Sequence, residues 1–274
     1  MTGIVEEITI GPARLILGDM REVLPALKMR ADMVMSDPPY MLSSGGNNGE
    51  LGGCFGRNRY DNGGALFDVV PWHEMAPIML AACADNAELI IMATDREEAR
   101  ARAAFEVEGA RFHRLLVWGK GTATPNRWFM PNCEFGLYLY KGKARRLNDC
   151  GARQMVQVRQ MDVSHHYLPA DLPKLERAPH PTEKPVKLLQ DWISNVTDPG
   201  ALVLDPFAGS GSTVVAAMRA GRRALAIEKD PKWFGVMVGR ARDALEVSRA
   251  AFRRAGVAFP ENGAVSAKTG GCGA

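Results

Sequence analysis

The sequence predicts an α/β protein whose doubly wound, mostly parallel sheet contains seven strands. Two observations predict this class. Short apolar runs of strand length alternate with longer segments of helical periodicity, as in proteins built around a parallel sheet. Several of these runs end in Asp, Gly or Pro, which favour turns after a strand. With 46% hydrophobic residues, the chain can also bury a sizeable core.

The expected strands are short and apolar, and most are followed by a turn and then by a helical segment. They cover residues 13–17, 31–36, 88–93, 111–118, 134–140, 201–204 and 223–227. The expected helices cover residues 21–27, 72–84, 95–107, 186–196, 213–220 and 231–247. The third helix is strongly charged, and the last is long and amphipathic, with an apolar face that belongs to the core. This alternation predicts a single domain over residues 1–259.

Three segments fall outside this alternation. Residues 41–64 are rich in Gly and Asn and too long for an ordinary connection, which indicates a lid or a binding loop. Residues 141–179 show little regular pattern and hold eight Lys or Arg against four Asp or Glu, a local excess of positive charge. Residues 260–274 are rich in Gly, which predicts a disordered tail.

The composition and the absence of certain motifs argue against several classes of protein. The formal net charge of +3 is too small to identify a nucleic-acid partner by itself. No apolar run approaches the roughly 20 residues of a membrane helix, so a soluble, cytoplasmic protein without a membrane partner is expected. The five cysteines are dispersed, which argues against a disulfide framework or a zinc site, and no metal is expected. Kinase-like, zincin and serine-hydrolase motifs are absent.

The first motif is the sequence D-P-P-Y at residues 37–40, directly after a buried strand. Ligands bind beyond the carboxyl ends of strands in open α/β sheets, so a site is expected here. Asp37 and the Pro38 carbonyl can accept hydrogen bonds from a planar amino group and draw its lone pair toward an electrophile. Two prolines stiffen the backbone, and Tyr40 offers a ring for a flat base. The alternative is a simple strand-end turn.

The second motif, D-P-F-A-G-S-G-S-T at residues 205–213, follows another strand and opens a helix. Its glycines allow a ligand to approach the backbone closely, and the helix N-terminus favours an anionic group. Val214 replaces the third glycine of a dinucleotide fingerprint, whereas Glu228, one strand later, suits a ribose diol. Together they predict a nucleoside cofactor without a pyrophosphate. A generic Gly-rich turn is the alternative.

These motifs resemble those of the DNA amino-methyltransferases that use S-adenosylmethionine. D-P-P-Y precedes D-P-F-x-G-x-G-x-T, which is the circularly permuted order of the family's beta group. Residues 180–185 match its H-P-T-x-K-P segment, and residues 132–141 resemble its E-x-h-h-h-h-x-K strand, in which h is apolar. The resemblance covers roughly residues 10–250. It implies a circularly permuted, Rossmann-like methyltransferase fold and direct transfer of the sulfonium methyl to an amine of a flipped-out base.

The resemblance also implies site residues. On the base side, Asp37, Pro38 and Tyr40 would hold the flipped base and its amino group, with Pro39 stiffening the backbone. On the cofactor side, Phe207, Gly209, Gly211 and Thr213 would wrap the methionine part above Asp205, and Glu228 would take the ribose hydroxyls. Asp19 would lie near the adenine and Lys184 near the cofactor's carboxylate. The alternatives are a helix N-cap for Asp19 and a surface lysine for Lys184.

The resemblance implies double-stranded DNA as the partner, with residues 141–179 as a small target-recognition insert and residues 41–64 as a second reading loop. D-P-P-Y is the commoner form among adenine-N6 enzymes, so N6-methylation of adenine is the favoured reaction. N4-methylation of cytosine stays open, as do an RNA or protein acceptor and an inactive nucleic-acid-binding member. A homodimer and a separate restriction endonuclease are further expected partners.

Overall fold

The computed structural model describes residues 3–39, 69–121, 123, 129–161 and 183–259. Within these ranges the strands are β1 (Ile4–Ile10), β2 (Ala13–Gly18), β3 (Ala31–Ser36), β4 (Cys83–Ala93), β5 (Arg111–Gly119), β6 (Cys133–Lys141), β7 (Val158–Gln160), β8 (Leu202–Asp205) and β9 (Arg223–Glu228). The helices are α1 (Met20–Ala26), α2 (Trp72–Ala81), α3 (Glu98–Val107), α4 (Val186–Val196), α5 (Ser212–Arg219) and α6 (Pro231–Arg254).

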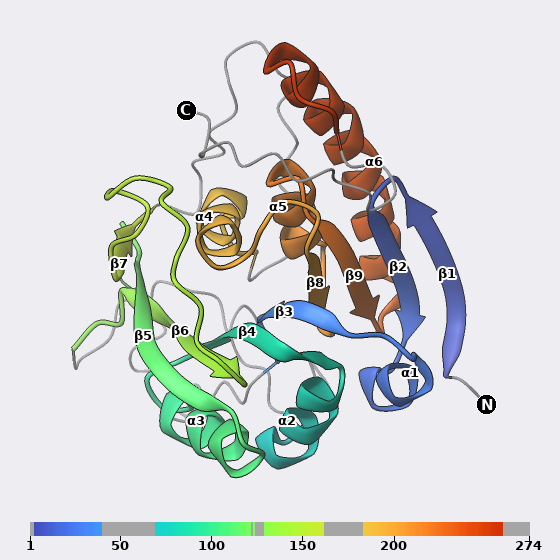
Figure 1. Ribbon diagram of the computed structural model, residues 1–274. Coiled ribbons are helices and arrows are strands. Elements are labelled where there is room, and N and C mark those ends of the chain that lie inside the picture. The colour runs from blue at the N-terminus through green and yellow to red at the C-terminus, as the bar shows by residue number, and fades with distance from the viewer. Residues whose placement is uncertain (1–2, 40–68, 122, 124–128, 162–182, 260–274) are drawn as a thin grey trace, which may run out of the picture.

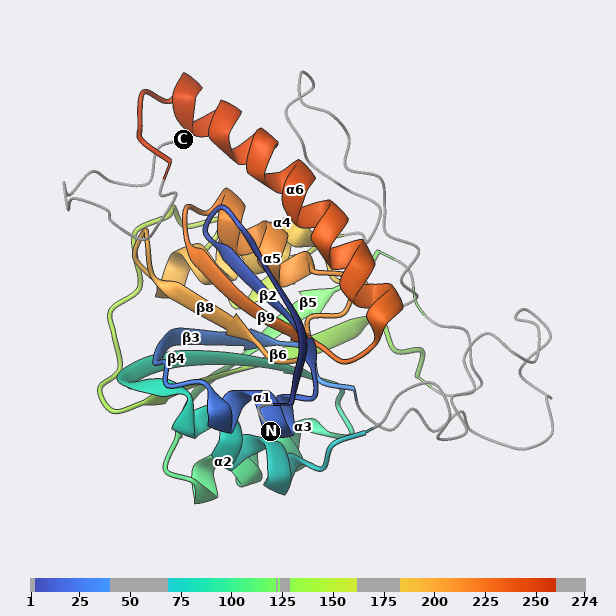
Figure 2. The same ribbon diagram turned by 90° about the vertical axis from the view of Figure 1, so that its right-hand side faces the viewer.

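All of these strands join one sheet in the order β1-β2-β9-β8-β3-β4-β6-β5-β7. Five of the eight neighbouring pairs are parallel, whereas β1–β2, β4–β6 and β5–β6 are antiparallel. Helices α1–α3 cover one face and α4–α6 cover the other, as Figures 1 and 2 show. Each face has its own apolar core, one centred on α4, α5 and α6 and one on α1, α2 and α3. The predicted doubly wound α/β class is therefore confirmed.

The described part of the sheet contains nine strands, not the seven predicted. The first missed strand, β1, carries mostly exposed side chains with two glutamates, so its sequence lacks the apolar run of a buried strand. It forms an edge hairpin with β2 through a turn at Gly11, whose φ of 53° favours glycine. The second, β7, has three residues and pairs with the end of β5 at the opposite edge. Such short edge strands carry little periodic signal.

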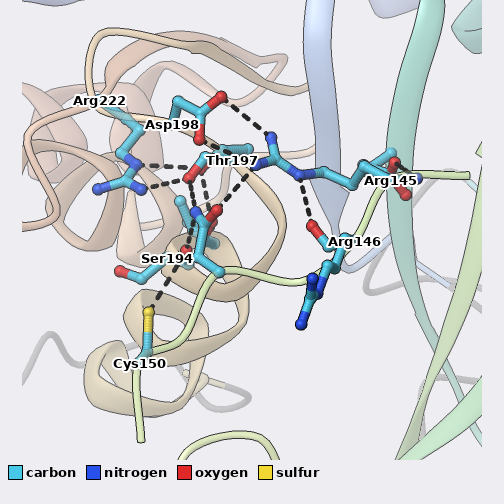
Figure 3. Close-up of polar contacts among 10 residues, drawn as sticks. Arg145, Arg146, Cys150, Ser194, Thr197, Asp198 and Arg222 are labelled. Carbon is cyan, nitrogen blue, oxygen red and sulfur yellow. Dashed lines mark hydrogen bonds and ion pairs between the residues drawn. The ribbon is translucent and has the colours of Figure 1, made fainter. Parts of the chain in front are cut away.

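The first part of the predicted target-recognition insert lies against α4. Arg145 pairs with Asp198 at 2.8 Å, a contact visible in Figure 3. Asn148 Nδ2 donates to the carbonyls of Ser194 and Thr197 at 2.9 and 2.6 Å. Further along, Arg159 pairs with buried Asp191 of α4 at 2.5 Å. Part of the insert's positive charge therefore ties it to the core. Residues 162–179 of this insert, the loop 41–64 and the tail 260–274 lie outside the described residues.

Candidate active site

The two motifs meet where the strand order reverses. From β3 the chain moves outward to β4, whereas from β8 it moves the other way to β9, and β3 and β8 are neighbours. Because these strands are parallel, their carboxyl ends open at the same edge, and such a switch point is where open α/β sheets bind ligands. Asp37 directly follows β3 and Asp205 ends β8. The fold thus brings together two motifs that are more than 160 residues apart.

A cavity of about 500 Å³ lies at this edge. That volume is within the usual range for small-molecule sites. Ten of the twelve predicted site residues line it, namely Asp19, Asp37, Pro38, Pro39, Lys184, Asp205, Phe207, Gly209, Thr213 and Glu228. Gly211 does not line the cavity, and Tyr40 lies outside the described residues. Among those residues no cluster of three His, Cys, Asp or Glu side chains is suited to hold a metal ion, and no helix is long and apolar enough to cross a membrane.

The glycine-rich loop is held open toward the cavity by its backbone conformation. Gly209 and Gly211 have φ values of 52° and 85°, a left-handed region that residues with a Cβ rarely adopt. Gly211 caps α5, and a Cβ there would lie 2.8 Å from Cγ of Met237. The N–H of Gly209 donates to Glu228 Oε2 at 2.7 Å, so the loop is joined to the end of β9. The alternative of a generic turn does not account for this connection across two strands.

Glu228 lines the same cavity, and its carboxylate accepts hydrogen bonds from backbone N–H groups without being saturated by them. Its Oε1 accepts a 2.8 Å hydrogen bond from the N–H of Asp230, and its Oε2 accepts the one from Gly209. Burial raises the pKa of this carboxyl, and the backbone donors oppose that shift. The N–H of Lys229 is a third backbone donor to this carboxyl, and a carboxylate has about four lone-pair positions, so one position remains for a further donor. Glu228 is thus suited to hold a diol at the cavity wall.

Asp205 points into the protein and connects the motifs. Its Oδ1 accepts hydrogen bonds from the Ser36 hydroxyl at 2.7 Å and from the N–H of Phe207 at 3.1 Å. Its side chain also interacts with Thr213 of α5. Burial raises the pKa of Asp205 to about 6. The residue therefore joins the two motifs at the cavity wall, and its place beneath the methionine part of a cofactor stays a prediction.

Asp37 belongs to a line of alternating charges. Lys184 Nζ contacts Asp37 Oδ2 and lies 3.3 Å from Glu134 Oε2, while Glu134 Oε1 lies 2.5 Å from Lys120 Nζ. Lys184 is only 6% exposed, so the alternative of a surface lysine is wrong. Its predicted contact with a cofactor carboxylate stays a prediction. In the structure its ammonium group serves two carboxylates of the protein.

Asp19 is the N-cap that the sequence offered as an alternative, and its position near a cofactor's adenine stays a prediction. It caps α1, where its Oδ1 accepts a 2.9 Å hydrogen bond from the N–H of Arg21, and it also lines the cavity. Ion pairs with Arg21 at 2.6 Å and Lys229 at 3.2 Å surround its carboxylate. The hydrogen bond from Arg21 holds the pKa of Asp19 well below its ordinary value. An ionised acceptor therefore stands at this end of the cavity.

Sequence reasoning missed several residues of the site. Trp233, near the start of α6, lines the cavity, although its sequence context suggested ordinary packing. Arg240, further along α6, is 6% exposed and pairs with Glu183 at 2.5 Å. Its guanidinium also donates to the carbonyl of Ser210 at 2.9 Å. Trp233 follows Glu228 by only five residues, which could have indicated that it lies near the same site. The sequence around Arg240 contains no motif that would have indicated its contacts.

The comparisons with known proteins agree with this site. The sequence profile of the N6_N4_Mtase family, described as DNA methylase, matches residues 31–236, which is most of the chain. The chain belongs to this DNA methylase family. The matched region contains both motifs, the strand that carries Glu134 and the start of α6. The methyl donor of the family is S-adenosylmethionine.

Individual relatives and solved structures align with more than four fifths of this chain. The Type II methyltransferase M2.DpnII of Streptococcus pneumoniae is 30% identical over 236 residues, which are 81% of this chain and 87% of that protein. The crystal structure of the M1.HpyAVI–SAM complex has a TM-score of 0.63 at 21% identity and covers 83% of this chain and 98% of its own. The cytosine-N4-specific PvuII DNA methyltransferase also has a TM-score of 0.63, at 15% identity, with 91% and 96% covered. The predicted family is therefore confirmed, and these structures share the fold.

Proposed function

We propose that this DNA methylase transfers the methyl group of S-adenosylmethionine to the exocyclic N6 of adenine in double-stranded DNA. The observation that carries the proposal is the state of Asp37. Its Oδ2 is held by Lys184, whereas its Oδ1 is buried and has no hydrogen-bond partner within the described part of the chain. Buried polar atoms are normally paired, so an oxygen left over in a cavity wall suits a substrate donor. An amino N–H is such a donor.

Different residues of the cavity wall suit the ribose, the adenine and the methionine part of the cofactor. Glu228 has an acceptor position left for the ribose diol, and Asp19 and Trp233 offer a hydrogen-bond acceptor and an aromatic ring for the adenine. The Gly209 loop and the N-terminus of α5 would hold the methionine part, with Phe207 against it. When bound, S-adenosylmethionine supplies an electrophilic methyl group on a positively charged sulfur. Asp37 lies in the wall of the same cavity, so the amine and the methyl would meet there.

The reaction needs positioning more than strong acid–base chemistry. The amine nitrogen forms a bond to the methyl carbon, and the carbon–sulfur bond breaks with its electron pair left on sulfur. The displaced N–H proton passes to Asp37 and from there to water. The base must leave the double helix to reach this cavity, so base flipping is part of the proposal. Asp37 and the Pro38 carbonyl orient the nitrogen lone pair toward the methyl group.

Adenine is preferred over cytosine because the motif is D-P-P-Y, the commoner form among adenine-N6 enzymes that it resembles. The two residues that accept the amino group serve either base equally, so this preference rests on sequence. Contacts to DNA are assigned to residues 41–64 and to the insert 141–179, whose sequences carry the Asn, Arg and Lys residues that suit base edges and phosphates. A homodimer and a separate restriction endonuclease belong to the same proposal.

The test measures products. Tritiated S-adenosylmethionine is incubated with genomic DNA that lacks amino-methylated bases, and the nucleosides are identified by mass spectrometry. Wild type is compared with Asp37→Ala and with Lys28→Met, an exposed substitution far from the cavity. We expect N6-methyladenine from wild type and Lys28→Met, and none from Asp37→Ala. N4-methylcytosine would overturn the choice of base, and label transferred to RNA or protein but never to DNA would overturn the acceptor.

A further inference from the structure

The charged side chains around Asp37 come from four different elements at the same edge of the sheet. Asp37 follows β3, Lys120 follows β5, Glu134 is the second residue of β6, and Lys184 precedes the Pro185 N-cap of α4. Strand β6 runs antiparallel to β4, so its beginning lies where the parallel strands end. The antiparallel pairing of β5 with β6 brings Lys120 beside Glu134. The arrangement is therefore a product of topology and not of one local motif.

Lys184 occupies the centre of this arrangement. Its Nζ contacts Asp37 Oδ2 on one side and Glu134 Oε2 at 3.3 Å on the other, and its side chain is 6% exposed. Glu134 is held in turn by Lys120 at 2.5 Å. The positions of both partners are thus restricted, and the ammonium group has little freedom to leave Asp37. Within the described ranges the other oxygen, Asp37 Oδ1, is buried and has no hydrogen-bond partner.

Most of the surroundings of Asp37 disfavour its ionised form, and two lysines favour it. Burial raises the pKa of Asp37, and the nearby Glu134 raises it further, while Lys184 and Lys120 lower it. Asp205, on the neighbouring strand β8, adds a second acidic group in the vicinity. A protonated Asp37 is a weaker hydrogen-bond acceptor and has no place for the proton released from the amine. The cavity therefore needs a fixed positive charge to keep this residue functional.

We propose that Lys184 is a positioning residue of the methyl transfer. Held between Asp37 and Glu134, it keeps the Asp37 carboxylate ionised and leaves Oδ1 for the substrate amine. This inference rests on the proposed role of Asp37 as acceptor of the amino group, and it assigns Lys184 to the acceptor side of the cavity instead of the cofactor's carboxylate. Glu134 and Lys120 act behind it, as the pair that holds Lys184 in place.

The test is the pH dependence of the single-turnover rate between pH 5.5 and 9.5, with saturating S-adenosylmethionine and DNA. Lys184→Met keeps most of the length of the side chain and removes its charge, Lys184→Arg keeps the charge, and Lys28→Met is the exposed control. The rate is measured on whichever methylated base wild type produces, so an error in the choice of base is visible separately in the wild-type product.

For Lys184→Met we expect a loss of about 100-fold at pH 7, of the size that misplaced reacting groups cause. The loss should shrink as the pH rises, because the buried Asp37 then ionises without its lysine. Lys184→Arg should keep the wild-type pH profile, and both variants should bind S-adenosylmethionine within a few-fold of wild type in a tryptophan fluorescence titration. In the background of Asp37→Asn, Lys184→Met should have little further effect, since both act through one carboxylate.

Two results would overturn the proposal. One is a Lys184→Met variant with the wild-type pH profile, whatever its rate. The other is a loss confined to cofactor affinity, which would return Lys184 to the cofactor's carboxylate. Should Lys184→Met not fold, as judged by circular dichroism, Glu134→Gln tests the same arrangement. The amide oxygen of this variant can still accept a hydrogen bond from Lys184, whereas the negative charge that raises the Asp37 pKa is gone, so activity should extend to lower pH. An unchanged pH profile would contradict the proposal.

Discussion

The hydroxyl of Ser36 donates a 2.7 Å hydrogen bond to Oδ1 of Asp205, across 169 positions of the chain. Ser36 ends β3 immediately before the D-P-P-Y motif, and Asp205 ends β8 and begins the glycine-rich motif. Both side chains are buried. The bond joins the end of β3 to the end of β8, so it fixes the two motifs relative to each other at the edge of the cavity.

Replacing Ser36 tests this connection. We expect Ser36→Ala to lower the free energy of unfolding by about 1–3 kcal/mol, because Asp205 loses a buried hydrogen-bond donor. The variant should also bind S-adenosylmethionine more weakly, since the loop above Asp205 loosens. Urea denaturation and a fluorescence titration measure the two effects. In the double variant with Asp205→Asn, the losses should be less than additive, and strict additivity would mean that the two residues do not act together.

The raised pKa of Asp205 predicts how stability depends on pH. The folded protein holds this carboxyl at a pKa of about 6, whereas its ordinary value is 3.8, so folding favours the protonated acid. The associated stability is fully present below pH 3.8 and is lost as the pH rises through 6. Asp205→Asn cannot titrate, so its unfolding free energy should fall less than that of wild type between pH 4 and 7. The expected difference is roughly 2–3 kcal/mol.

A control for this pH series is Asp198→Asn. The hydrogen bond from Arg145 holds the pKa of the exposed Asp198 below its ordinary value, which is the opposite sign. The stability that Asp198 contributes is present above pH 3.8 and is lost on acidification through its folded-state pKa. This variant should differ from wild type mainly at neutral pH and converge with it in acid. Parallel curves for Asp205→Asn and wild type would rule out a titrating Asp205.

Gly211, the N-cap of α5, has a backbone conformation and surroundings that both favour glycine. Its φ of 85° opposes a side chain, and so does Met237, whose Cγ would lie only 2.8 Å from an added Cβ. Gly211→Ala should therefore destabilise the protein by about 2 kcal/mol and weaken cofactor binding. Gly235→Ala in α6 is the matched control, because nothing lies within 4 Å of its Cβ position. That variant should be about 1 kcal/mol more stable, since alanine favours a helix.

Glu228→Gln tests the ribose assignment. The loss of a charged acceptor should raise the Kd for S-adenosylmethionine about 10- to 100-fold, the range expected for hydrogen bonds to an ionised group. Stability should change less, because the amide oxygen still accepts from Gly209. Isothermal titration calorimetry measures the Kd, with Glu246→Gln, an exposed substitution on α6, as the control. Equal affinities in all three proteins would remove Glu228 from the cofactor site.

Replacing Arg240 should lower the stability of the protein, although this residue does not line the cavity. Arg240→Met leaves Glu183 as a buried charge without its 2.5 Å partner and removes a donor from the Ser210 carbonyl. Breaking such a pair typically costs about 3–5 kcal/mol. The double variant Arg240→Met with Glu183→Gln should recover part of that loss in urea denaturation. A double variant that is less stable than Arg240→Met would show that the pair is not the source of the effect.

A comparison of the predicted with the observed strands shows which strands the hydrophobic pattern of the sequence can identify. The seven predicted strands are all present, and each pairs with a neighbouring strand on both sides. The edge strands β1 and β7 escaped prediction because solvent, and not the core, receives most of their side chains. Likewise, the apolar face of α6 predicted the helix as far as 247, whereas its last turns to Arg254 continue with little burial.

What the sequence determined by itself was the alternation of strands and helices, the two motifs that end β3 and β8, and the kind of chemistry that an acidic, proline-stiffened turn and a glycine loop allow. The tertiary structure decided which side chains meet. Lys184, Glu134 and Lys120 come from separate elements, and Arg240 reaches Ser210 from a helix with no motif of its own. Local sequence reflects backbone conformation and burial, whereas the pairing of charges depends on strand order, which places residues far apart in sequence at one edge of the sheet.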